Sequence, residues 1–68
     1  MSSRIFQLKE KVQQAIPSNE LPKTVFARLM LKTGIMWSGV QATTEVSDAQ
    51  YSKAVSAVKE IFGSKIQL

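Results

Sequence analysis

The stretch VSDAQYSKAVSAVKEIFG, residues 46–63, carries the start, the face and the stop of one amphipathic helix. Ser47 and Gln50 have the S-x-x-Q spacing of a capping box, in which each side chain bonds the other residue's backbone N–H. Gly63 lies where a left-handed residue after the helix is expected. The apolar positions repeat at three- and four-residue steps, as on one helical face. These positions are Tyr51, Ala54, Val55, Val58, Ile61 and Phe62. The sequence therefore predicts a helix from about Ser47 to Phe62.

Two further helices are expected before this one. Apolar residues near the N-terminus recur at helical spacing, which predicts a helix over about residues 3–16. Its apolar residues are Ile5, Phe6, Leu8, Val12, Ala15 and Ile16. Pro17 ends it, since the residue before a proline is pushed out of the helical region. Pro22 suits the first position of a second helix, where the missing N–H of proline is not needed. The apolar face of that helix consists of Val25, Phe26, Leu29 and Met30, with Leu31 beside it.

The residues that follow Gly34 are open to two interpretations. Gly34 itself is expected to end the second helix with a positive φ. One interpretation of the next residues is a short helix from about Trp37 to Thr44. The other is a β-hairpin over residues 35–46, favoured by the alternating and β-branched pattern after the Ser38-Gly39 turn. An isolated hairpin is marginal unless helices cover it. We therefore predict an all-α domain of three or four helices spanning residues 1–68, with an α+β fold as the alternative.

Composition excludes most catalytic chemistry. The 68 residues allow a single small domain, and they include neither cysteine nor histidine. The usual general base and the usual thiol nucleophile are therefore missing, as are thiolate and imidazole metal ligands. The five carboxylates are scattered along the chain, and no phosphate-binding glycine motif is present. We expect no enzymatic activity, no metal and no cofactor.

The charge balance bears on the kind of partner. Nine Lys and Arg residues against five Asp and Glu residues give a net charge of +4. Such an excess favours an anionic partner, with nucleic acid first and an acidic protein surface second, although it can also serve solubility alone. No apolar run is long enough to span a membrane, and the first residues lack the apolar core of a signal peptide. We expect a cytoplasmic protein that does not enter the membrane.

One pattern points toward DNA. Met30 lies four residues before Gly34, Ile35 directly follows it, and Val40 lies six residues beyond it. Over this segment the spacing resembles a helix-turn-helix unit, in which the glycine allows two helices to cross closely. The second helix of such a unit would read base edges, and cations on the first would contact phosphates. The predicted nucleic-acid-binding residues are Lys23, Arg28, Lys32, Trp37, Ser38, Gln41 and Thr44. A homodimer on a repeated site is expected, because one such unit covers little DNA.

A different function is equally compatible with the pattern. Trp37, the only tryptophan, can anchor the core instead of contacting a partner, and Met30 and Met36 would make a nearby surface adaptable. The chain would then be a protein-interaction module, such as a helical adaptor, an inhibitor or a homodimer, without nucleic-acid binding. Its contact surface would be the apolar stripe of the first helix, docked in a partner's groove. That stripe consists of Ile5, Phe6, Leu8 and Val12.

Overall fold

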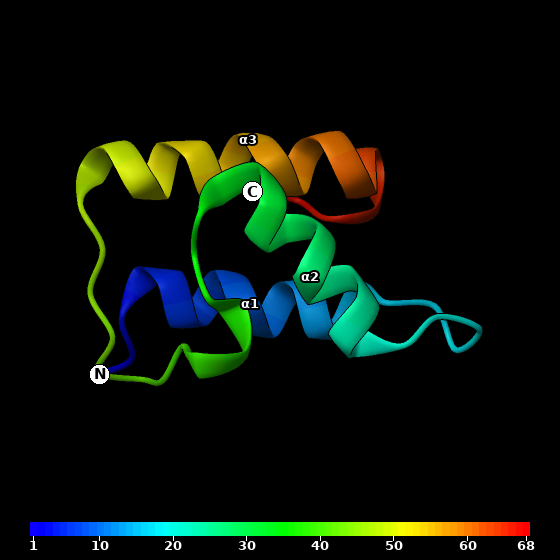
Figure 1. Ribbon diagram of the computed structural model, residues 1–68, viewed down its shortest axis with the longest axis horizontal. Coiled ribbons are helices and arrows are strands. Elements are labelled where there is room, and N and C mark those ends of the chain that lie inside the picture. Colours follow the sequence, from blue (N-terminus) through cyan, green and yellow to red (C-terminus); the bar gives the residue numbers. More distant parts are fainter.

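Three α-helices and two short 3₁₀ turns make up the computed structural model, which describes all 68 residues (Figure 1). The helices are α1 (Arg4–Ala15), α2 (Pro22–Thr33) and α3 (Asp48–Phe62), and the 3₁₀ turns are η1 (Trp37–Gly39) and η2 (Gly63–Lys65). In Figure 1, α1 and α3 run along opposite edges of the molecule and α2 crosses between them. No strand is present, so the predicted all-α fold is confirmed and the hairpin alternative is wrong.

Helix α3 begins and ends where the sequence predicts. The Gln50 N–H donates to Ser47 Oγ at 3.1 Å, and the Ser47 N–H donates to Gln50 Oε1 at 3.0 Å, which completes the capping box. Gly63 follows the helix with a φ of 58°, and its N–H bonds the Lys59 carbonyl. Val58 is fully buried, whereas Tyr51 and Val55 lie half-buried at the edge of the core. The apolar face is therefore centred nearer Val58 than Tyr51.

The first two helices also match their predicted bounds closely. Ser3 caps α1, since its Oγ accepts a hydrogen bond from the Phe6 N–H at 3.3 Å. Pro22 occupies the first turn of α2. Gly34 has a φ of 74° and donates its N–H to the Met30 carbonyl at 2.7 Å. This positive φ confirms the predicted role of Gly34 as the residue that ends α2.

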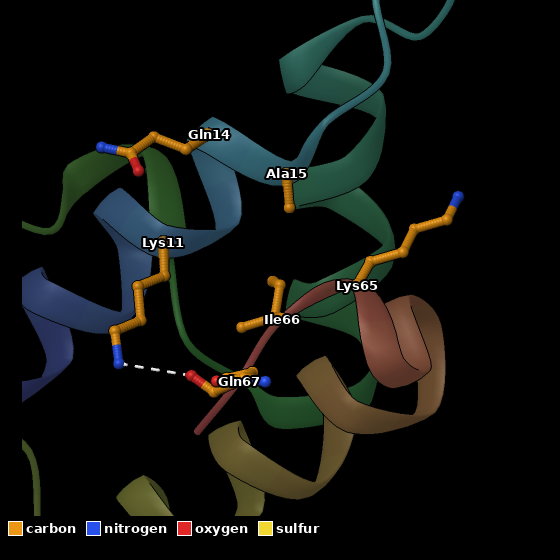
Figure 2. A pocket seen from close by; sticks show the side chains of 6 residues that line it. All are labelled: Lys11, Gln14, Ala15, Lys65, Ile66 and Gln67. Carbon is orange, nitrogen blue, oxygen red and sulfur yellow. Dashed lines mark hydrogen bonds between the residues drawn. The ribbon is translucent and has the colours of Figure 1, made fainter.

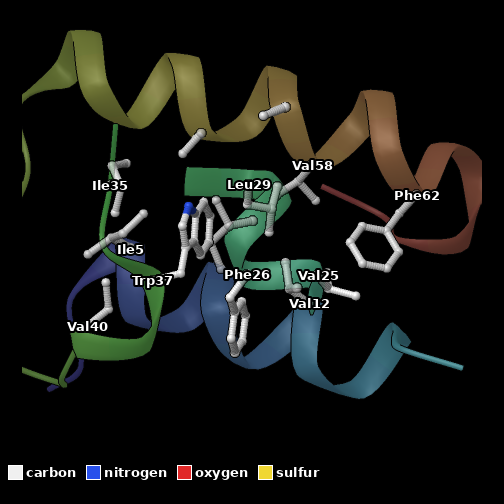
Figure 3. Packing of buried hydrophobic residues seen from close by; sticks show 13 residues of the cluster. Ile5, Val12, Val25, Phe26, Leu29, Ile35, Trp37, Val40, Val58 and Phe62 are labelled. Carbon is white, nitrogen blue, oxygen red and sulfur yellow. The ribbon is translucent and has the colours of Figure 1, made fainter. Parts of the chain in front are cut away.

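The core is a cluster of 13 buried apolar residues to which the three helices and the segment after Gly34 contribute. Figure 3 shows Trp37 and Leu29 in the middle of this cluster, with Val40 and Ile35 toward one end and Phe62 at the other. The Trp37 and Phe26 rings are nearly parallel, with 6.5 Å between their centroids. The loop residues from Ile35 to Val40 thus close the core between α2 and α1.

The predicted helix from Trp37 to Thr44 is wrong. Helical structure there is limited to η1, after which Val40 is extended and a separate turn links the Gln41 carbonyl to the Thr44 N–H at 3.0 Å. Ile35, Trp37 and Val40 are all buried. Ile35 and Trp37 are two residues apart. Side chains at this spacing point to the same side of an extended chain but not of a helix. Burial of these three side chains outweighs helix formation, which Gly39 also disfavours.

The two loop glycines give a matched test of the turn that ends α2. We expect Gly34→Ala to lower the free energy of unfolding by about 1–2 kcal/mol, because a Cβ is strained at positive φ. Nothing lies within 4 Å of the position that this Cβ would take, so the cost comes from the backbone alone.

Gly39→Ala is the control, since its added Cβ would make ordinary contact with Met36 at 3.6 Å and the residue has no positive φ. Its stability should be unchanged or raised by up to about 1 kcal/mol. Urea denaturation of both variants measures the difference, and equal midpoints would contradict the assigned geometry of Gly34.

Candidate functional site

Two of the predicted DNA-contacting cations are engaged within the chain. Lys32 Nζ lies 2.9 Å from Glu60 Oε1 on α3, and Arg28 Nη1 lies 4.0 Å from Glu20 Oε1. These pairs are exposed, so each contributes no more than about 1 kcal/mol. A phosphate would nevertheless compete with a carboxylate at both positions, and the positive potential of this flank of α2 is reduced.

The predicted outward orientation of Trp37 is wrong, and the alternative, an anchor in the core, is confirmed. The side chain is 1% exposed and its indole N–H donates to Thr33 Oγ1 at 3.1 Å. Ser38 and Gln41 are exposed and Thr44 is half-buried, but no helix aligns them on one face. The recognition helix of a helix-turn-helix unit is therefore absent.

The apolar stripe of α1, predicted as a docking surface, is also used inside the molecule. Ile5, Leu8 and Val12 are all buried in the core, and Phe6 is half-buried against it. No partner can reach the three buried side chains without unfolding α1 from α3. The predicted interaction surface on α1 does not exist in the folded chain.

Three of the predicted site residues do meet, at a small hollow between α2 and η1. Its volume is about 180 Å³, and it is lined by Lys23, Phe26, Ala27, Met30, Met36, Trp37 and Ser38. We call it the α2–η1 hollow. The stacked rings of Phe26 and Trp37 are almost fully buried, whereas Met36 is 63% exposed. Pockets for drug-sized ligands start at about 300 Å³, so this hollow suits a single apolar side chain.

Two exposed apolar side chains, Met30 and Met36, line this hollow, and two more lie in the same stretch of the chain. Apart from Met1 and Leu68 at the chain ends, every exposed large apolar residue lies between positions 21 and 36. These residues are Leu21, Met30, Leu31 and Met36, and Leu31 is 85% exposed. Sequence reasoning named the two methionines as an adaptable surface but gave Ala27 no role. It placed Leu31 beside the apolar face of the second helix, whereas Leu31 lies opposite the buried residues of α2.

A larger hollow of about 350 Å³ lies between the end of α1 and the C-terminal residues (Figure 2). Its lining is Lys11, Gln14, Ala15, Lys65, Ile66 and Gln67. Lys11 Nζ donates to the Gln67 carbonyl at 3.4 Å, while Lys65 extends in another direction, away from Lys11. The two cations do not converge on one point, so this hollow does not form an anion site.

The third hollow, beside Arg4 and Glu45, does not offer a free cation for an anion either. Arg4 already binds Asp48 at 2.6 Å and the Val46 carbonyl at 3.3 Å, and it lies over the Tyr51 ring.

No three His, Cys, Asp or Glu side chains come together to hold a metal ion. None of the helices has the length and apolar character needed to cross a membrane.

Comparisons of the chain with models of known protein families, with curated proteins and with solved structures found no match. The site must therefore be interpreted from its own geometry.

The floor of the α2–η1 hollow is held by one hydroxyl group. Thr33 Oγ1 donates to the Leu29 carbonyl at 2.7 Å and accepts from the Ile35 N–H at 3.2 Å as well as from the Trp37 indole. Thr33 is the one buried polar residue of the protein. Its three hydrogen bonds use the whole capacity of the hydroxyl and fix the plane of the indole ring.

Replacing Thr33 by valine tests this arrangement. The change keeps the shape of the side chain but leaves two buried N–H groups without a partner, so we expect a loss of about 1–3 kcal/mol in the free energy of unfolding. Trp37 fluorescence should shift as the ring loses its fixed position. Thr24→Val, at an exposed position of the same helix, should stay within about 0.5 kcal/mol. Equal losses in the two variants would contradict the role of the hydroxyl.

Proposed function

We propose that this chain is a protein-interaction module that binds a segment of another protein at the α2–η1 hollow. The observation that carries the proposal is the clustering of exposed apolar side chains on and around α2, beside a hollow with an aromatic floor. Neighbouring exposed apolar side chains, such as Met30 and Met36 in the lining of the hollow, mark interaction sites more often than isolated exposed residues do.

The properties of the hollow fit recognition of one anchoring side chain. Phe26 and Trp37 are stacked and buried, so the floor is formed before any partner arrives. Little conformational entropy is then lost at the floor on binding. Met30 and Met36, which form the walls, are flexible enough to close around side chains of different shape. Ala27 leaves the hollow open because its side chain is short. Leu31 lies one helical turn after Ala27 on α2 and is 85% exposed.

Nucleic-acid binding is the second candidate, and the net charge of +4 supports it. The ion pairs of Arg28 and Lys32 and the absence of a helix over residues 37–44 weaken the particular helix-turn-helix arrangement. A phosphate-binding function would therefore depend on scattered lysines, without a surface that reads bases.

Selection from a display library of random short peptides tests the interaction function. We expect the enriched peptides to shift the NMR signals of Ala27, Met36 and the Trp37 indole. Ala27→Gln fills the hollow with an uncharged side chain, so it should weaken binding by about tenfold or more, as expected for loss of an anchor contact.

Ala49→Gln is the control, because Ala49 is an exposed helical alanine remote from the hollow, on α3. It should leave peptide binding unchanged. Enriched peptides that bind both glutamine variants as well as the unaltered chain would count against this function.

A titration with non-specific duplex DNA at two salt concentrations distinguishes nucleic-acid binding from the protein-interaction function. The interaction module predicts no more than trace binding at either concentration. Binding that falls steeply with salt, with shifted amides at Arg28 and Lys32, would favour nucleic acid. In that case Lys32→Ala should reduce the salt dependence by about one unit.

A further inference from the structure

We infer that the partner segment is acidic: a bulky apolar side chain enters the α2–η1 hollow, and a carboxylate next to it pairs with Lys23. The inference rests on the proposed function of the hollow and adds the charge of its ligand. The observation behind it is that Lys23, the cation at the hollow, is unpaired, whereas the two other cations of α2 are paired with carboxylates.

Lys23 is the only charged residue that lines the hollow, and it has no carboxylate within 4 Å. Lys9 lies beside the same aromatic floor, with its Nζ 5.9 Å from the centre of the Phe26 ring. Lys9 donates to the Val40 carbonyl at 2.9 Å but likewise forms no ion pair. One unpaired cation, Lys23, therefore borders the hollow, and a second, Lys9, lies near the Phe26 ring of its floor without lining it.

The other flank of α2 is different. There Arg28 and Lys32 are compensated by Glu20 and Glu60. Of the three cations on α2, the two on this flank are thus paired, whereas Lys23, at the hollow, is not. A ligand with carboxylates beside its apolar anchor complements this side in both polarity and charge.

The same charges argue against a second copy of the chain as the occupant. In a two-fold dimer, the same patch of surface faces itself. Lys23 of one copy would then approach a hollow whose only charged residue is the same lysine. Because like charges brought together at an interface are destabilising, a different and acidic protein fits better.

Two synthetic peptide libraries provide the probe. Both place Leu, Phe or Trp at the centre; in one the flanking positions are drawn from Asp, Glu, Ser and Ala, and in the other from Lys, Arg, Ser and Ala. The unaltered full chain is screened against both. We expect binders from the acidic library only, with affinity that falls as salt is raised, since the Lys23 side chain is exposed.

Substitutions at Lys23 then measure its contribution. Lys23→Gln should weaken the selected acidic peptides by about threefold and Lys23→Glu by about tenfold, the range of an exposed to partly desolvated ion pair. Lys53→Glu is the matched control, because it makes the same change of charge on the exposed face of α3. This variant should bind the peptides with little change.

The outcomes distinguish the inference from the function on which it rests. Binders from both libraries that require Ala27 but not Lys23 would overturn the acidic partner and leave the interaction function standing. If neither library yields a peptide whose binding Ala27→Gln weakens, the interaction function itself is overturned. A dimer in sedimentation that Ala27→Gln dissociates would also overturn the acidic partner, since a second copy would then cover the hollow.

Discussion

The hydroxyl of Thr33 is the constraint on which the rest of the structure depends. In one position it donates to the Leu29 carbonyl in the last turn of α2, accepts the Ile35 N–H of the following loop, and orients Trp37. A buried donor without a partner costs more than an average hydrogen bond contributes. Every buried side-chain polar atom of this protein has a hydrogen-bond partner, so the core does not carry the cost of an unsatisfied donor or acceptor.

The arrangement of the loop after α2 follows from that anchor. With Trp37 fixed against Thr33 and stacked on Phe26, the chain leaves the helical conformation on either side of η1, and Val40 after it is extended. Ile35 and Trp37 then point inward, and Met36 between them points outward. The interaction that closes the core therefore also places an apolar side chain at the rim of the hollow. Packing and the candidate binding surface have one structural origin.

The sequence was sufficient to predict the helices and their ends where local signals and the pattern of burial agree. The capping box of Ser47 and Gln50, and Gly34 after α2, specify helix ends through backbone chemistry within a few residues. The segment after Gly34 could not be predicted in this way, because its course is set by three side chains that reach a core made by other helices. The charge pattern was misleading for a similar reason: Glu60, which pairs with Lys32, lies 28 positions away in sequence.

Exposed apolar side chains on so small a protein favour self-association, and the net charge of the protein opposes it. A 68-residue core leaves little stability in reserve, so Leu31 and Met36 in water add a risk of self-association without strengthening the fold. A net charge of +4 opposes that association, because two copies repel each other before their apolar surfaces meet. Under the proposed function, the same charge would also favour an acidic partner. Lys23, unpaired at the hollow, would then act in two ways, keeping the free molecules apart and attracting a ligand of opposite charge.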